Sequence, residues 1–309
     1  MNANNNLPQA AQKSRFSVAI NTPAYKQLIA NTLNEPKKQS RFIASITSAV
    51  AVNPALQECT PQTIIAGALL GESLSLSPSP QLGQFYLVPF KQKAKYSRNG
   101  DLLEPECTKA TFVLGYKGMI QLAMRSGHYK KIVVLEMKEG EVKSFNPLEE
   151  EIDCVIITDP EAREQAPTVG YYAMFEYVNG FRKSMYWTTA QMIRHADRYS
   201  AAFSASTYEK LQRGEIPEKE LWKYSSFWYK SFDEMAKKTM LRQIISHWGA
   251  MSTDLETAIV SDGASLGISG NDIIVDDPVP MEDPSAPTLS DSDETADPSG
   301  SGEVDINTL

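Results

Sequence analysis

Lysine and arginine residues interleaved with aromatic residues are the feature of this sequence that points most directly to a chemistry. They gather in four segments: Lys91–Arg98, Tyr116–Lys131, Arg194–Tyr199 and Tyr229–Arg242. Cationic side chains neutralise phosphates and aromatic rings stack on bases, which is how many proteins hold single-stranded nucleic acid. Each cluster alone is more often an ordinary solvated surface. Four on one chain make nucleic-acid binding an equally good explanation.

The last of these clusters has a defined geometry if its residues are helical. Lys238 and Arg242 are one turn apart and would share a stripe, because residues four apart lie on the same face of a helix. An apolar stripe beside them would anchor the helix and consists of Leu241, Ile244, Ile245 and Trp248. Such a helix would hold its cations at fixed positions along a phosphate backbone. The tryptophans of this region are more typical of a core than of base-stacking platforms.

No segment has the pattern of a catalytic centre. Gly67–Ser73 has glycines spaced as in a phosphate loop but lacks the Gly-Lys-Ser/Thr ending, and small residues four apart in an apolar helix favour close packing instead. The acidic runs Glu104–Glu106 and Glu149–Asp153 have polar neighbours, which is typical of solvated loops rather than of a magnesium-dependent nuclease. The three Cys and three His are scattered, which disfavours a disulfide framework, a zinc site and a Cys/His nucleophile. We therefore expect no enzyme activity, no metal site and no cofactor.

The net charge of −8 is distributed unevenly along the chain. No Lys or Arg follows Arg242, whereas 14 of the 38 acidic residues lie between Asp254 and Asp305, so residues 1–250 carry 30 cations against 24 anions. This asymmetry suggests a nucleic-acid-binding body with an acidic tail, although a solubilising tail on an ordinary body explains the charge equally well. Composition divides the chain into a flexible N-terminal arm (1–24), a core (25–250) and an acidic, largely disordered tail (251–309).

Apolar periodicity and turn residues predict the elements of the core. Helices are expected over Ala24–Val52 (two, broken near Pro36), Gln62–Leu74, Tyr116–Arg125, Thr188 to Tyr199 and Glu218–Trp248. Strands are expected over Phe85–Phe90, Ala110–Leu114, Ile132–Met137, Glu151–Ile157, Val169–Val178 and Phe181–Thr188. Asn179-Gly180 joins the last two strands and is a strong hairpin turn signal. The order predicts an α+β fold in which a central antiparallel β-sheet is flanked by helices.

The chain lacks the run of roughly 18 apolar residues that a membrane helix needs. Its first residues have neither the basic flank nor the apolar run of a secretory signal. We therefore expect a soluble, cytoplasmic protein with no membrane partner.

The chain contains the segments Gln84–Phe90, Leu114–Gly127 and Asp233–Arg242 in that order. Together they resemble the RecT family of phage and prophage single-strand annealing proteins, in the order of the family and near its spacing. The hairpin at Asn179-Gly180, followed by Tyr186-Trp187-Thr188, resembles members from phages of Gram-positive hosts. The likeness spans residues 25–250. One departure is a longer stretch between the strands that flank residues 91–107. If it is an inserted β-hairpin, its lysines would lie outside the DNA groove.

The resemblance implies ATP-independent binding of single-stranded DNA and annealing of complementary strands in phage-type homologous recombination. Family members form rings or helical filaments on DNA, where a positively charged groove holds one strand by its backbone and leaves its bases exposed. A homo-oligomer, an annealed duplex intermediate, a phage exonuclease and a host single-strand-binding protein are the implied partners, in the cytoplasm of a bacterial host. Magnesium would act only as a non-specific ion that screens phosphate repulsion.

The resemblance also implies a set of DNA-binding residues. By motif position they are Lys237, Lys238, Arg242, Tyr116, Lys117, Arg125, Tyr129, Lys130, Arg194, Arg198, Lys91 and Lys95. Gly115 and Gly118 are expected to permit close approach of backbone rather than to contact DNA.

Other functions remain open on the sequence alone. A single-strand-binding protein that protects DNA without annealing it needs the same contacts. A nuclease or DNA-modifying enzyme is disfavoured by the missing catalytic centre, and a structural phage assembly protein would show no salt-dependent DNA binding. The acidic tail could compete with DNA for the groove, recruit the exonuclease or simply keep the protein soluble.

Overall fold

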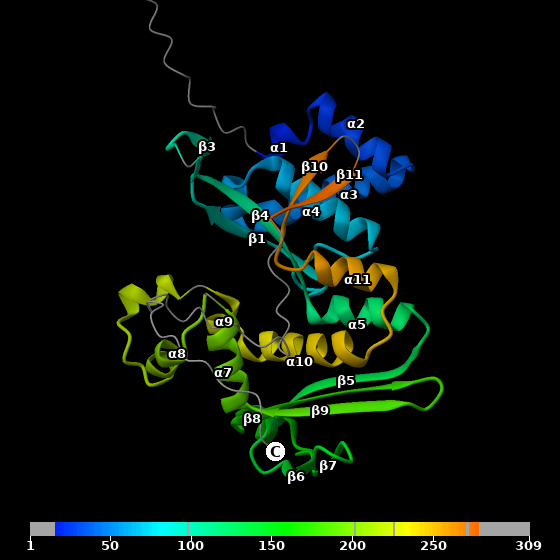
Figure 1. The fold of residues 1–309 in the computed structure, drawn as a ribbon, viewed down its shortest axis with the longest axis vertical. Helices are drawn as coiled ribbons and strands as arrows, with labels where there is room; N and C mark the ends of the chain where they lie inside the picture. Colours follow the sequence, from blue (N-terminus) through cyan, green and yellow to red (C-terminus); the bar gives the residue numbers. More distant parts are fainter. Residues whose placement is uncertain (1–15, 98, 201, 225, 270–271, 278–309) are drawn as a thin grey trace, which may run out of the picture.

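The computed structural model describes residues 16–277 apart from residues 98, 201, 225, 270 and 271 (Figure 1). The helices are α1 (Phe16–Ala19), α2 (Pro23–Thr32), α3 (Pro36–Val52), η1 (Pro54–Glu58), α4 (Pro61–Ser73), α5 (Tyr116–Arg125), α6 (Pro160–Gln165), α7 (Thr189–Tyr199), α8 (Ala205–Gln212), η2 (Glu218–Lys223), α9 (Phe227–Lys230), α10 (Phe232–Trp248) and α11 (Thr253–Val260). The strands are β1 (Phe85–Gln92), β2 (Lys95–Tyr96), β3 (Leu102–Glu104), β4 (Cys107–Leu114), β5 (Tyr129–Lys138), β6 (Val142–Asn146), β7 (Glu151–Cys154), β8 (Thr168–Tyr177), β9 (Arg182–Thr188), β10 (Ser265–Ser269) and β11 (Asp272–Asp277).

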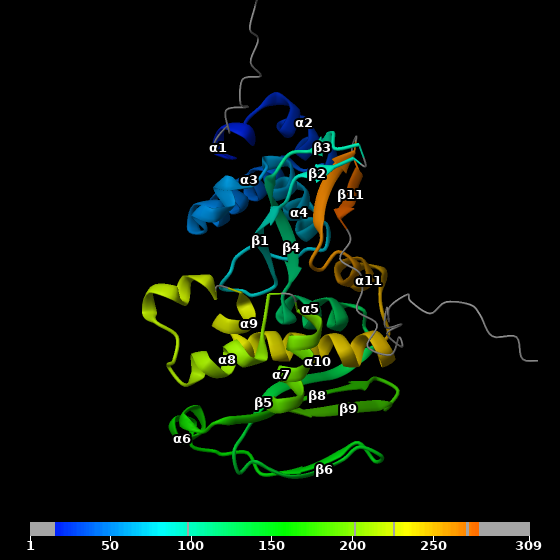
Figure 2. The same ribbon diagram turned by 60° about the vertical axis from the view of Figure 1, so that its left-hand side comes forward.

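Antiparallel strands and helices together confirm the α+β class. The strands divide between two main sheets instead of forming one: a four-stranded sheet in the order β1-β4-β10-β11 and a three-stranded sheet in the order β5-β8-β9. Two further ribbons, β2–β3 and β6–β7, lie outside them. Figures 1 and 2 show α5 and α10 as a helical layer between the two main sheets. One continuous buried core joins both sheets through this layer.

Helix α4 packs against the first sheet through its two glycines. A Cβ at Gly71 would lie 2.3 Å from the Phe85 ring, and a Cβ at Gly67 would lie 2.7 Å from Leu87. Both glycines therefore serve close packing of helix against strand, as the sequence predicted. The segment that most nearly resembles a phosphate loop, Gly67–Ser73, is the C-terminal half of this helix, and its residues 67–71 are buried.

The hairpin β8–β9 and the helix after it form where local signals place them. Gly180 has a φ of +89°, and the Asn179 side chain accepts a hydrogen bond from the Phe181 N–H at 3.0 Å. Thr188 caps α7 in a reciprocal capping box with Gln191. The helix then ends at Tyr199, the predicted residue.

Two predicted segments are more divided than the periodicity indicated. The region expected to be one helix over Glu218–Trp248 consists of η2, α9 and α10, because Ser231 has an extended φ of −146° between the last two. The long stretch after β1 contains a hairpin, the ribbon β2–β3.

The predicted boundaries of the core are wrong at both ends. In the assigned N-terminal arm, Phe16, Ala19 and Ile20 are buried; residues 1–15 lie outside the described part. The core continues past residue 250 through α11, β10 and β11, with Leu255 and Leu266 fully buried. Averaging composition over an Asp- and Ser-rich stretch hid these short apolar patterns. The predicted disorder of residues 278–309 concerns residues outside the described part.

The core that ends at Asp277 has no excess of positive charge. Residues 251–277 add six acids and no cation, so residues 1–277 carry 30 cations and 30 anions. The excess positive charge predicted for the body is therefore absent, and DNA binding would depend on how individual charges are arranged on the surface.

Within the described residues, none of the helices is both long and apolar enough to cross a membrane.

Candidate nucleic-acid interface

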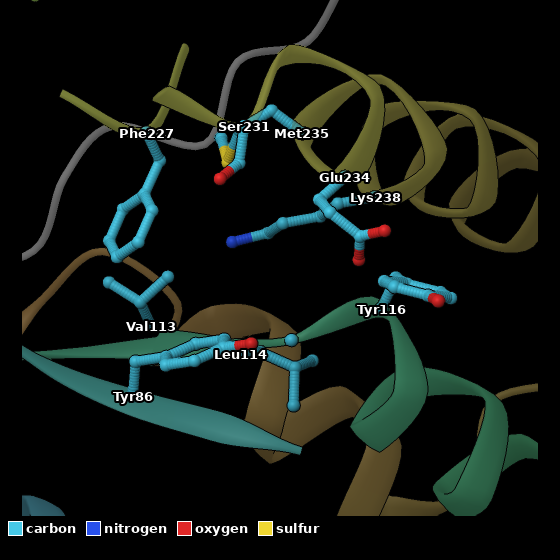
Figure 3. Close-up of a pocket in the computed structure, with 10 residues that line it drawn as sticks. Tyr86, Val113, Leu114, Tyr116, Phe227, Ser231, Glu234, Met235 and Lys238 are labelled. Carbon is cyan, nitrogen blue, oxygen red and sulfur yellow. The ribbon is translucent and has the colours of Figure 1, made fainter. Parts of the chain in front are cut away.

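A small cavity lies where the helical layer meets the first sheet. Its volume is about 80 Å³. The lining side chains come from β1, β4, α5, α9 and α10, and include Tyr86, Tyr116, Phe227, Glu234 and Lys238. In Figure 3 the Lys238 side chain extends across the cavity, with Phe227 and Tyr86 toward one end and Glu234 and Tyr116 toward the other. All three segments that carry the family resemblance thus meet at one place, although the last begins more than 100 residues after the second ends.

Two glycines bring α5 close to the chain that leads into β1. A Cβ at Gly115 would lie 2.1 Å from the Gly83 carbonyl oxygen, and a Cβ at Gly118 would lie 2.1 Å from that of Gln84. The predicted role of Gly115 and Gly118 in close backbone approach is therefore confirmed. Gly115 is also the N-cap residue of α5, and no side chain caps this end. The positive end of the α5 dipole opens toward the cavity, where it favours an anion.

The α10 cations are paired with carboxylates. The Lys237 ammonium lies 2.7 Å from Glu234 and 3.5 Å from Glu136, and 5.2 Å from the centre of the Tyr116 ring. Burial alone would lower the pKa of Lys237, but the hydrogen bond to Glu234 and the two acidic charges raise it above its ordinary value. Lys237 is therefore protonated near neutral pH, and the carboxylates of Glu234 and Glu136 already balance its charge.

Lys238 and Arg242 share one buried carboxylate. Lys238 Nζ and Arg242 Nη1 each lie 2.8 Å from an oxygen of Asp262, whose side chain is 3 % exposed. Asp262 follows α11, in the segment predicted to be part of the acidic tail. The predicted stripe on α10 exists, but its partner is an acid of this chain.

Two other predicted contacts have structural roles. Tyr129 is buried and donates a hydrogen bond to the Ala250 carbonyl at 2.9 Å; burial raises the pKa of its hydroxyl further. Arg125 donates to the carbonyls of Leu74 and Ser75, at 2.6 and 2.8 Å. Both groups hold the fold together.

The remaining predicted residues are spread over the surface. Lys117 is exposed at the start of α5, Lys130 pairs with Glu176 at 2.6 Å, and Arg194 and Arg198 are exposed on α7. Lys91 is exposed on β1 and Lys95 belongs to β2. Figures 1 and 2 place the ribbon β2–β3 far from α10, so the Lys95 segment does not join the cavity. The structure thus unites the α5 and α10 clusters but not all four.

The α7 cluster contains one residue that is not a cation near pH 7. His195 lies between the rings of Trp187 and Tyr199, with ring centres 5.2 and 4.7 Å from its own, and burial lowers its pKa to about 4.

In the part of the chain that the structure describes, no group of three or more His, Cys, Asp or Glu residues could hold a metal ion.

The acids that pair with the α10 cations were missed by sequence reasoning. Glu234 stands three residues before Lys237, a spacing that predicts an ion pair on a helix. Glu136 and Asp262 carry no such local signal, because they come from other elements.

Comparison with known proteins decides the family. A sequence model of the RecT family matches residues 40–276. The chain belongs to the RecT family. It is 32% identical over 257 residues to the uncharacterized protein YqaK of Bacillus subtilis (strain 168), which covers 83% of this chain and 75% of that protein. It is 26% identical over 258 residues to protein RecT of Escherichia coli (strain K12), with 84% of each covered.

RecT-family membership identifies the chain as a recombination protein of the annealing class. The family match ends one residue before the end of β11. It therefore includes α11 and Asp262, in agreement with the extended core.

Proposed function

We propose that this RecT-family protein binds single-stranded DNA and anneals complementary strands without ATP, acting as an oligomer on the DNA. The observation that supports this most is the meeting of α5 and α10 around one cavity, with the Lys238 ammonium inside it and the uncapped start of α5 beside it. Phosphate contacts of this kind position a strand without reading its sequence. Annealing needs that property, because any sequence must be held with its bases available.

The charge balance indicates how strong such binding would be. Because residues 1–277 carry equal numbers of cations and anions, long-range attraction to DNA is weak for one protomer. Modest contacts that repeat along an oligomer add up, since neighbouring protomers share one strand. We therefore expect weak binding by a single protomer and much tighter binding by the assembly, whether ring or filament.

The proposed reaction uses no nucleotide, and the segment that most nearly resembles a phosphate loop is helical, with its residues 67–71 buried in α4. Magnesium would act only by screening phosphates. A phage exonuclease would supply single strands, and a host single-strand-binding protein would cover them; both are partners that this function requires.

An annealing assay tests the proposal. Complementary oligonucleotides, one labelled with a fluorophore and one with a quencher, are added one after the other to the protein without nucleotide. We expect quenching faster than the uncatalysed rate. Binding without acceleration would instead identify a single-strand-protecting protein, and cleavage of labelled DNA with magnesium would identify a nuclease.

A matched pair of variants tests the interface. Lys117→Gln removes an exposed cation beside the cavity, and Lys26→Gln removes one on α2 at the far end of the molecule. We expect the slope of log affinity against log salt to become shallower by about 1 for Lys117→Gln only. Equal slopes for the two variants would exclude this face as the interface.

A further inference from the structure

The Asp262 carboxylate joins three elements at the edge of the cavity. One oxygen accepts hydrogen bonds from Lys238 Nζ at 2.8 Å and from the Leu114 N–H at 2.9 Å. The other accepts from Arg242 Nη1 at 2.8 Å. Leu114 ends β4, Lys238 and Arg242 belong to α10, and Asp262 follows α11. One buried acid therefore links the helix that carries the cations to the strand on the other side of the cavity.

We propose that Asp262 is a positioning residue of the DNA interface: it orients Lys238 and Arg242 for contact with the phosphates of a single strand. The inference rests on the proposed function, because it names how the same face is organised. Long Lys and Arg side chains lose rotamer entropy when they are immobilised, and fixing them in advance removes that cost from binding. Each cation keeps hydrogen-bond donors beyond the one that Asp262 accepts.

The exposure of the three side chains fits this role. Asp262 is 3 % exposed and Lys238 12 %, whereas Arg242 is 30 % exposed. In the described part of the chain, Arg242 has no ion pair other than the one with Asp262. Its remaining N–H groups can therefore reach a phosphate while the bond to Asp262 stays intact. The triad as a whole has a charge of +1.

A competing role for Asp262 would be to block the site as an internal substitute for phosphate. Its burial and its third hydrogen bond argue against that role. If the carboxylate moved away, the buried Leu114 N–H would lose its acceptor, and an unsatisfied buried donor destabilises the fold. A displaceable acid would be more exposed and would carry no such structural bond.

The two roles predict opposite changes in DNA affinity for the substitution Asp262→Asn. Asp262→Asn removes a negative charge, which by itself strengthens DNA binding. Loss of positioning weakens it. Asp254→Asn is the matched control, because Asp254 is exposed in the first turn of α11 and its loss changes the charge equally.

The measurement is the affinity of the full chain for a poly-dT oligonucleotide across a salt series. For Asp262→Asn we expect roughly tenfold weaker binding and a slope of log affinity against log salt that is shallower by about 1 to 2. The affinity of Asp254→Asn should equal or slightly exceed that of wild type. Binding by Asp262→Asn as tight as that of Asp254→Asn would overturn the proposal. So would weaker binding with an unchanged slope, which would indicate a general loosening of the fold. If wild type itself does not bind, the proposed function fails.

A second background separates positioning from folding. In the double variant Lys238→Gln, Arg242→Gln, adding Asp262→Asn should cause no further loss of affinity, because the groups that Asp262 orients are gone. A further loss of similar size would overturn the proposal. Melting temperatures are measured for every variant. If Asp262→Asn does not fold, Asp262→Glu replaces it: the charge is kept, the carboxylate is displaced, and wild-type affinity would count against the proposal.

Discussion

Arg125 was predicted to contact DNA, and its geometry instead predicts a role in stability. Its guanidinium donates to two carbonyls at the C-terminal end of α4, Leu74 and Ser75. Ser75 has a φ of +52°, in the left-handed region that a residue with a Cβ adopts at a cost. A cation at a helix C-terminus also interacts favourably with the helix dipole. Arg125 therefore holds a turn that the local sequence does not favour.

Arg125→Gln removes both hydrogen bonds and the charge. A hydrogen bond from a charged donor contributes about 1.5–3 kcal/mol when buried and less at the surface. Because Arg125 is exposed, solvent weakens both bonds below that range, and we expect a total loss of about 1–2 kcal/mol. A domain of this size loses about 2–4 °C in melting temperature per kcal/mol. The variant should therefore melt about 2–8 °C below wild type.

Thermal unfolding followed by circular dichroism measures this loss. Arg194→Gln is the control, because Arg194 is an exposed arginine in the middle of α7 and the described residues give it no ion pair. The control should have the same melting temperature as wild type. An unchanged melting temperature for Arg125→Gln, together with a salt slope of DNA binding shallower by about 1, would refute the structural role and restore Arg125 as a phosphate contact.

Two further predictions concern Glu141, a buried acid between β5 and β6, and the C-terminal boundary of the core. Burial raises the pKa of Glu141, but hydrogen bonds from Arg163 and two backbone N–H groups outweigh it and hold that pKa below its ordinary value. Arg163→Ala should therefore cost about 3 kcal/mol in urea unfolding near neutral pH. Because the lowered pKa contributes stability above the unfolded value and loses it as pH falls, the difference should shrink below about pH 4; a constant difference would contradict the account. A chain ending at Asp277 should unfold as cooperatively as the full chain, whereas one ending at Val260 should not fold, because it lacks β10. If both fold alike, the extended core is wrong. The chain ending at Asp277 also tests the acidic tail, since unchanged affinity and salt slope would exclude competition for DNA.

Local signals in the sequence were sufficient for several elements. Tyr116–Arg125 is helical over the predicted residues, between Gly115 and a Gly127 whose φ is +74°. The β8–β9 turn and the start of α7 also formed as predicted. Each of these depends on residues within a few positions of one another, which is the range over which glycine, turn and capping preferences act.

The sequence by itself determined the family, the α+β class and the helix that carries Lys238 and Arg242. Only the tertiary structure decided what those cations bind, because Asp262 and Glu136 come from elements that are distant in sequence. The same is true of Tyr129 and Arg125, whose partners are backbone carbonyls of other segments. A cation count does not show which charges are already neutralised. That depends on distances of a few ångströms, which folding sets and composition does not.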